Sequence, residues 1–288
     1  MILGVDIGGT SIKAGVVDQD GTVLKMDRVK TPKQQEEFVH ALIKLINGLW
    51  TEYSGQINAI GIGCPGPLDA KNGMILKTPN IPQMTDLKTP LQNNFDVPIF
   101  FDNDANCFTL AEALYGAGKD HAVVLGITLG TGFGAGLVIN DIIYSGRGNA
   151  LELAHTVIDK NETVVFPNLV RGCVEQYVST AGVLFSAKKY DLDVAEPIDV
   201  FQLAEVKNDK ALAVWKEFGW NLGIVLTNAV CAFDPDVIVI GGQMNQAWQY
   251  FEEAMQESLE KNCIHPTPLI VRATVKEAGI VGASLLIR

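Results

Sequence analysis

The sequence predicts an α/β protein of two lobes, each containing a glycine-rich β-hairpin. Residues 123–139 read VVLGITLGTGFGAGLVI, in which one apolar run enters a cluster of glycines and a second leaves it. This pattern indicates a strand, a tight turn and a returning strand. The pattern also occurs 122 positions earlier, where Leu3, Gly4, Gly8 and Val16 align with Leu125, Gly126, Gly130 and Val138. The repetition favours two related domains that present their hairpins to one shared ligand.

The N-terminal half alternates strands and helices as an α/β lobe does. An amphipathic helix is predicted at 33–50, because apolar residues recur there at helical spacing: Phe38, Leu42, Leu45, Ile46 and Leu49. A second helix is expected to end at Tyr115, before a boundary at 116–118. Strands are expected at 2–6, 12–17, 22–27, 59–64 and 97–101.

The C-terminal half continues the same alternation after its hairpin. Helices are predicted near 175–190 and at 211–233, 248–262 and 279–286, strands at 237–240 and 269–273, and a polar stretch at 191–199. We therefore expect a smaller N-terminal lobe, 1–117 plus 275–288, and a larger C-terminal lobe, 118–274. The active site is expected in the cleft between them.

Charge and composition limit the classes of partner that the chain is expected to bind. The net charge is −11 and no run of basic residues occurs, which argues against nucleic acid or an anionic membrane as a partner. The longest charge-free run, 121–140, approaches the length of a membrane span, but its five glycines favour a buried strand pair. Met1 leads directly into an apparent strand without a secretory signal pattern. A soluble cytoplasmic protein is expected.

The cysteines indicate a reducing compartment. They are odd in number, widely spaced and free of any CxxC pair. We expect buried free thiols at all five positions: Cys64, Cys107, Cys173, Cys231 and Cys263.

The first hairpin has the residues that a magnesium-bound phosphate requires. Asp6 lies at a strand end beside the exposed amides of Gly8, Gly9 and Thr10, and Lys13 follows. Such amides bind phosphate oxygens, and the carboxylate holds the water shell of the metal. A structural glycine turn is the alternative interpretation.

Polar residues after extended segments are candidates for substrate contacts. Asp104 follows a strand, where a carboxylate could accept a proton from a hydroxyl group, although the spacing alone favours a solvated loop aspartate. Asn80 and Asn103 could bond hydroxyl groups or cap turns. The Gly241–Gly242 pair after a buried strand marks either a ligand crevice or a tight turn.

The second hairpin also matches the dinucleotide fingerprint GxGxxA at 130–135. That fingerprint requires a helix directly after the glycines, whereas an apolar strand pattern continues here to 139, so the dinucleotide interpretation fails. Thr131 and Gly132 remain as candidate phosphate contacts. Downstream, Glu152, His155 and Glu175 could form a polar cluster, or the histidine could be structural.

Taken together, these motifs resemble the ROK family of repressors and sugar kinases, which has the actin-like, ribonuclease-H-like ATPase fold. The resemblance runs from Leu3 to the closing AGIVGA segment at 278–283. Its motifs are, in order, DxGGT (6–10), PGP (65–67), Asn80 in TPNIP, Asn103-Asp104, LGTGxGxG (129–136), ExxH (152–155) and GCxE (172–175).

The resemblance implies a role for each motif. Asp104 would be the base that deprotonates the 6-hydroxyl of the sugar. The sugar ligands would be Gly66, Asn80, Asn103, Asp104, Glu152, His155 and Glu175. The ATP phosphates would lie on Gly8, Gly9, Thr10, Lys13, Thr131 and Gly132, with Mg²⁺ bound through water to Asp6, and Gly241 and Gly242 would contact adenosine.

The chain departs from the family at its zinc motif. Family members usually have CxCGxxGCxE, whose cysteines bind a structural zinc together with the histidine of ExGH. Here Phe166 and Asn168 stand at two of the cysteine positions, Leu169 replaces a glycine and Ala154 replaces the glycine of ExGH. One cysteine and one histidine do not make a tetrahedral site, so we expect no zinc.

The resemblance thus implies a glucokinase-like hexose kinase that uses ATP and Mg²⁺, and since dimers are common in the family, a homodimer is one expectation for its assembly. A non-catalytic sugar sensor, or a regulator without its DNA-binding domain, is the alternative. The family acts on glucose, N-acetylmannosamine, allose, fructose and β-glucosides, and the motifs do not distinguish among them.

Overall fold

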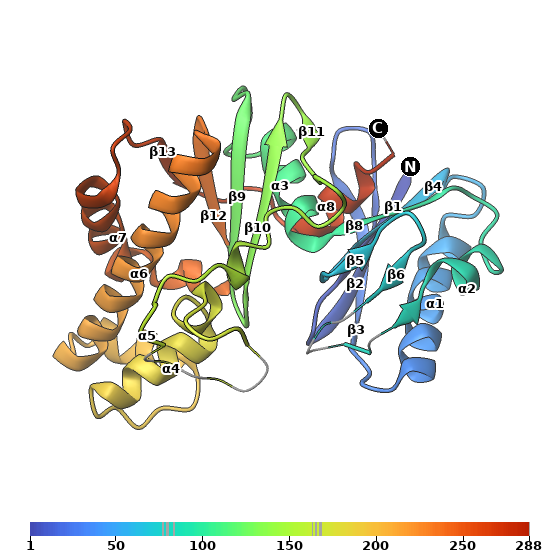
Figure 1. Cartoon of the computed structure of the whole chain (residues 1–288). Helices are drawn as coiled ribbons and strands as arrows, with labels where there is room; N and C mark the ends of the chain where they lie inside the picture. Colours follow the sequence, from blue (N-terminus) through green and yellow to red (C-terminus); the bar gives the residue numbers. More distant parts are fainter. Residues whose placement is uncertain are drawn as a thin grey trace. The chain divides into compact units, whose positions relative to one another are not determined.

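The computed structural model describes residues 1–76, 78, 81–82, 84–162, 164, 166 and 169–287, which form two compact units (Figure 1). Unit 1 comprises Met1–Gly126, Gly136–Leu151 and Ala273–Arg288, and unit 2 comprises Ile127–Ala135 and Glu152–Arg272. The lobes expected from the sequence differ from these units at 118–126, 136–151 and 273–274, which belong to unit 1.

The first sheet has the strand order β3-β2-β1-β4-β8. The strands β1, β2 and β3 form an antiparallel meander, whereas β4 and β8 run parallel to β1. All five strands correspond to predicted ones: β1 (Ile2–Ile7), β2 (Ser11–Val17), β3 (Val23–Lys30), β4 (Ala59–Cys64) and β8 (Ile99–Asn103).

Three helices accompany this sheet. The helix α1 (Gln35–Glu52) buries the five apolar residues that predicted it. The helices α3 (Asp104–Tyr115) and α8 (Ala278–Ser284) pack against each other, and α8 also packs on β1 and β4. Glycine makes this approach possible, because a Cβ atom at Gly4 or Gly61 would overlap the backbone carbonyl of Ile280 or Ala283.

The second sheet repeats the order of the first, as β11-β10-β9-β12-β13. The strand β2 and its counterpart β10 (Phe133–Ile139) differ by the same 122 positions that relate the two sequence motifs. The duplicated glycine hairpin is confirmed. The other strands are β9 (Val123–Leu129), β11 (Ile142–Ile143), β12 (Val237–Gly241) and β13 (Leu269–Arg272).

The helices of unit 2 are α4 (Thr180–Lys189), α5 (Pro197–Glu205), α6 (Asp209–Phe233) and α7 (Trp248–Asn262). The buried aromatic rings of Trp215, Phe218 and Phe251 join α6 to α7. Short 3₁₀ helices are η1 (Leu153–His155), η2 (Val174–Gln176) and η3 (Gln243–Ala247).

Some sequence predictions were wrong. The helix predicted near 175–190 begins only at Thr180, because Ser179 caps it by accepting a hydrogen bond from the Gly182 amide. The end of the predicted polar stretch begins α5. The helix α2 (Lys88–Gln92) and the small sheet β5 (Leu68–Asp69), β6 (Met74–Ile75), β7 (Thr85–Asp86) were not predicted.

Two cysteines also differ from expectation. Cys64, Cys107 and Cys173 are buried free thiols as predicted, but Cys231 is exposed and Cys263 is half-buried. Cys231 lies on α6, whose apolar residues outnumber the positions of its buried face. Among the described residues, no helix combines the length and apolarity that a membrane span needs.

Candidate active site

In unit 1, the predicted residues follow the carboxyl ends of three parallel strands. The register pairs Asp6 of β1 with Gly63 of β4, and Gly63 with Asp102 of β8. Neighbouring parallel strands end at the same edge of a sheet, so the segments after β1, β4 and β8 lie together there. The predicted phosphate loop, Gly66 and Asp104 are on these segments.

In the first glycine loop, side chains hold two backbone carbonyl groups, and the amides that follow these carbonyls point in the opposite direction. Thr31 Oγ1 donates to the carbonyl of Gly8 at 2.6 Å, and Lys33 Nζ donates to that of Gly9 at 3.1 Å. In a trans peptide the following N–H points opposite to the carbonyl. The amides of Gly9 and Thr10 therefore point away from these partners, and neither donates a hydrogen bond within the described part of the chain.

Lys13 is paired, an arrangement that the sequence did not indicate. Its Nζ lies 2.7 Å from Oε2 of Glu277, at the junction of β13 and α8. Burial raises the pKa of Asp6, Lys13 opposes that shift, and Glu277 adds to it. Glycine at position 279 makes room for the Asp6 carboxylate, since a Cβ atom there would lie 2.6 Å from its carboxyl carbon.

Asp104 is the first residue of α3 and is half-buried. Its Oδ1 accepts a hydrogen bond from the Ala105 amide at 2.9 Å. Asn103 is the N-cap, with its Oδ1 accepting from the amides of Ala105 and Asn106. The cap interpretation of Asn103 is thus correct, and its Nδ2 donates no hydrogen bond to any other described residue.

The neighbouring Asp102 is engaged differently. Its Oδ1 accepts from the Asn103 amide and from Asn106 Nδ2, both at 2.7 Å. Burial raises the pKa of Asp102, and these two hydrogen bonds oppose the shift. Asp102 therefore has a structural role in shaping the turn into α3.

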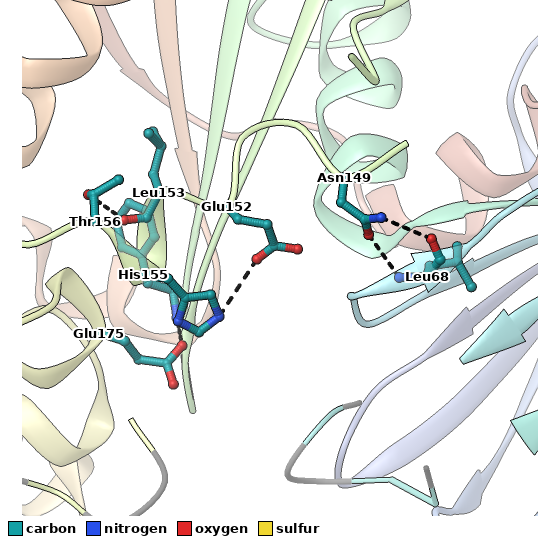
Figure 2. Close-up of polar contacts among 8 residues, drawn as sticks. Leu68, Asn149, Glu152, Leu153, His155, Thr156 and Glu175 are labelled. Carbon is teal, nitrogen blue, oxygen red and sulfur yellow. Dashed lines mark hydrogen bonds and ion pairs between the residues drawn. The ribbon is translucent and has the colours of Figure 1, made fainter. Parts of the chain in front are cut away.

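Gly66 lies between β4 and β5, in a segment that Asn149 holds. The Asn149 side chain accepts from the Leu68 amide at 2.8 Å and donates to the Leu68 carbonyl at 3.2 Å (Figure 2). The side-chain amide thereby replaces one residue of a neighbouring strand. The other predicted sugar ligand of this region, Asn80, lies outside the described residues.

In unit 2, the second glycine loop repeats the arrangement of the first. The carbonyl of Gly130 accepts from both the amide and Oγ1 of Thr180, each at 3.1 Å. The amide of Thr131 consequently points away from α4 and donates no hydrogen bond within the described residues. A threonine thus fixes a carbonyl in each loop, Thr31 in the first and Thr180 in the second.

Glu175 contacts this second loop directly. Its Oε2 accepts from the Phe133 amide at 3.3 Å, and a Cβ atom at Gly132 would lie only 2.7 Å from the same oxygen. Gly242 also lies close to this loop, since its α-hydrogen faces the backbone of Leu129. Its φ is +93°, a conformation that favours glycine. Position 242 therefore requires glycine on geometric grounds, whereas a side chain at position 132 would displace the Glu175 carboxylate.

His155 is the last residue of η1 and Glu152 directly precedes this helix, both in unit 2. Glu152 Oε2 is 3.8 Å from His155 Nε2, and both side chains are partly exposed (Figure 2). Burial raises the pKa of Glu152, His155 opposes that shift, and the charge of Glu175 adds to it. The three predicted polar residues therefore interact electrostatically, with Glu175 bridging to the glycine loop.

The donor set for a structural zinc does not fit this chain. Phe166 stacks edge-on against Phe185 with ring centroids 6.2 Å apart, at a position where the family has a metal-binding thiol. Across the described residues, no group of three or more histidine, cysteine or acidic side chains is arranged to hold a metal ion. The expectation of no zinc stays a prediction.

The glycine loops do fit the phosphates of ATP. Phosphate oxygens require amide donors, and the first loop presents those of Gly9 and Thr10 while the second presents that of Thr131. A half-buried carboxylate next to the first loop, Asp6, is a suitable outer ligand for a hydrated Mg²⁺ ion.

Two sheets of identical strand order, each with an outward-facing glycine loop, define the class as the actin-like ATPase fold in the form that sugar kinases have. The "ROK family" model matches residues 2–288, and the chain belongs to the ROK family. It is thus a sugar kinase by fold and by family.

Individual relatives agree with this assignment. The chain has a TM-score of 0.87 and 30% identity to the crystal structure of a ROK family glucokinase from Streptomyces griseus in complex with glucose and AMPPNP, with 99% of this chain and 98% of that chain covered. It is 28% identical to the glucokinase of Thermotoga maritima, over 100% of this chain and 97% of the relative. It is 31% identical to the N-acetyl-D-glucosamine kinase of Vibrio cholerae, over 99% of each.

Several residues around the candidate site were not predicted. Glu277 and Asn149 hold predicted residues through contacts 264 and 81 positions apart in the chain. No local pattern marks such pairs. Gln176 is different, because it directly follows the predicted residue Glu175 in the sequence.

Proposed function

We propose that this chain transfers the γ-phosphoryl group of ATP to the 6-hydroxyl of a hexose, with Asp104 as the general base. The observation that supports this most is the placement of Asp104 and the first glycine loop on one edge of the same sheet, after β8 and β1. Phosphoryl transfer needs an anion cradle and a base in a fixed arrangement, rather than a covalent intermediate.

Asp104 accepts the proton of the attacking hydroxyl group. Its backbone position is fixed because it begins a helix whose N-cap, Asn103, is itself satisfied. The hydrogen bond from the Ala105 amide to Oδ1 also fixes the carboxylate orientation. A positioned base of this kind typically contributes about 10²–10⁴-fold to the rate.

The phosphates are assigned to the amides of the two loops, formed by Gly8, Gly9 and Thr10 and by Thr131 and Gly132. Lys13 adds a positive charge, and Gly241 and Gly242 are assigned to adenosine. Mg²⁺ would neutralise phosphate charge, and Asp6 would hold it through water.

The sugar is assigned to a set of polar residues on loops and short helices. Carboxylate, amide and imidazole groups match the hydroxyl groups of a hexose as hydrogen-bond partners. The members are Gly66, Asn80, Asn103, Asp104, Glu152, His155 and Glu175. Glucose and N-acetylglucosamine are the first sugars to test, because the relatives named above act on them.

The base assignment is tested with Asp104→Asn. We expect sugar affinity, measured calorimetrically without nucleotide, to change by less than about fivefold while kcat falls by about 10²–10⁴-fold. Asp102→Asn is the matched control, since it removes a neighbouring carboxylate that is engaged by Asn103 and Asn106. Turnover of the Asp104→Asn protein within tenfold of the wild type would exclude Asp104 as the base.

The reaction itself is tested by coupled ADP release across a panel of hexoses. Sugar-dependent ADP release supports the kinase assignment, and its absence with every hexose would favour a sugar sensor or regulator. We also propose a cytoplasmic homodimer, for which light scattering of the purified protein gives the mass directly.

A further inference from the structure

The segment that carries Glu175 is fixed by hydrogen bonds within unit 2. The Val174 amide donates to the Thr156 carbonyl at 2.9 Å, and the Ile158 and Asp159 amides donate to the Gly172 carbonyl at 2.9 and 3.1 Å. These contacts join the segment after η1 to the start of η2. The backbone after Glu175 is fixed as well, because the amides of Gln176 and Tyr177 donate to the carbonyls of Cys173 and Val174 at 3.1 and 2.9 Å.

Gln176 adds a side-chain contact to these backbone hydrogen bonds. Its side chain is fully buried, and its Oε1 accepts from the Gly172 amide at 2.9 Å. This bond fixes the orientation of the side-chain amide, because only oxygen can accept from an N–H donor. Its Nε2 must therefore point away from Gly172.

Gln176 lines a small cavity. Nε2 is buried and has no hydrogen-bond partner within the described part of the chain, and the same holds for Oγ of Ser186 on α4. Both residues line a cavity of about 10 Å³, together with Gly182, Val183 and Phe218. This volume is about that of a single water molecule, which needs at least two polar partners.

We propose that Gln176 is the positioning residue for Glu175, held between the Gly172 amide and one buried water molecule that it shares with Ser186. The water accepts from Gln176 Nε2 and donates to Ser186 Oγ, which satisfies both buried groups. Through it, η2 is joined to α4 without a metal ion. The catalytic relevance of this linkage rests on the proposed sugar-binding role of Glu175.

The linkage matters because the Glu175 carboxylate has little else to hold it. Among the described residues, one hydrogen bond reaches this carboxylate, from the Phe133 amide, and it is long at 3.3 Å. A shift of η2 therefore moves the carboxylate relative to the glycine loop. Gln176 and its water resist that shift, because an unpaired buried amide is unfavourable in any other arrangement.

A crystal structure of the wild-type protein tests the water directly. We expect one ordered water within about 2.7–3.2 Å of both Gln176 Nε2 and Ser186 Oγ, and metal analysis of the same preparation is expected to find less than about 0.1 zinc per chain. A cavity without water density, or one zinc per chain, would overturn the proposal. This readout does not depend on any enzymatic activity.

Variants test the positioning role. Gln176→Leu is expected to raise the KM for sugar about tenfold while the KM for ATP and kcat stay within about twofold. Ser186→Ala is expected to raise the KM for sugar about threefold. The matched control is Ser258→Ala, which removes another buried hydroxyl group without a hydrogen-bond partner, on α7, and is expected to change neither KM.

Equal changes in both KM values, or an unchanged sugar KM in Gln176→Leu, would contradict the positioning role. If that variant does not fold, Gln176→Glu keeps the acceptor for Gly172 and removes the Nε2 donor, and the same rise in sugar KM is expected. If wild-type protein phosphorylates no hexose, the proposed function fails, and the crystallographic water still decides the structural part of the inference.

Discussion

Substitution of Gly132 by alanine perturbs the contact between the second glycine loop and Glu175. The new Cβ atom would lie 2.7 Å from Glu175 Oε2. Ordinary van der Waals contact begins at about 3.4 Å, so the carboxylate oxygen must retreat by about 0.7 Å. The retreating atom is the end of a flexible side chain, and the loop itself does not need to move.

The retreat removes the hydrogen bond from the Phe133 amide. That bond is already 3.3 Å long, and a further displacement of this size takes it beyond hydrogen-bond distance. A hydrogen bond to a charged group contributes about 1.5–3 kcal/mol, and a long one lies at the lower end of this range or below it. A loss of about 1–1.5 kcal/mol corresponds to sugar affinity weakened about five- to tenfold.

Calorimetric titration of sugar without nucleotide measures this effect. Gly130→Ala is the matched control, because its methyl group enters open space two residues earlier. We expect the control to bind sugar as the wild type does and to keep its stability, and Gly132→Ala to lose no more than about 1.5 kcal/mol of stability. The reasoning would be refuted if Gly132→Ala bound sugar normally while Glu175→Gln bound it weakly.

Three further predictions follow from the site and its supports. Because the pKa of Glu152 is raised above 4.5, the KM for sugar should rise as the pH falls through that higher pKa. Glu152→Gln should remove this pH dependence. The contribution of Glu152 to the stability of the protein should fall as the pH rises from 4.5 to the raised pKa. Lys13→Ala should raise the KM for ATP about tenfold with little effect on sugar affinity, since it removes a charge from the phosphate loop. Glu112→Gln should lower the free energy of unfolding by about 3 kcal/mol, because the buried carboxylate accepts from the amides of Ala117, Thr274 and Val275.

Each has a result that contradicts it. A KM for sugar that stays constant from about pH 4 to about pH 7, the range in which a carboxyl group with a raised pKa titrates, would exclude a binding role for ionised Glu152. An unchanged KM for ATP in Lys13→Ala would mean that Glu277 alone is its functional partner. A melting temperature of Glu112→Gln equal to that of Glu36→Gln, an exposed control on α1, would show that the buried acceptor contributes nothing.

Local patterns predicted the parts of the fold that depend on neighbours in sequence. The glycine hairpins, the α1 core residues and the strands of both sheets follow from apolar periodicity and turn residues. The error at the start of α4 arose because an apolar pattern extends across Ser179, and the capping hydrogen bond of that residue decides where the helix begins.

The supports of the site were beyond such patterns. Lys13 pairs with Glu277 and Glu112 binds the amides of Thr274 and Val275, both across more than half of the chain. These contacts form only when the first sheet is complete, so the composition of the chain and the spacing of its residues do not predict them. Motif resemblance assigned the candidate ligand contacts and gave no indication of the residues that support them.

The packing of α8 has a consequence for synthesis on the ribosome. This helix meets the backbones of β1 and β4 directly at Gly4 and Gly61, yet it is translated only after the whole of Glu152–Arg272. A nascent chain therefore exposes one face of its first sheet throughout elongation of unit 2. Unit 1 therefore completes its native packing only after α8 has been synthesised, although its first strands emerge first, and we expect a prematurely terminated chain that lacks α8 to expose apolar surface and to aggregate readily.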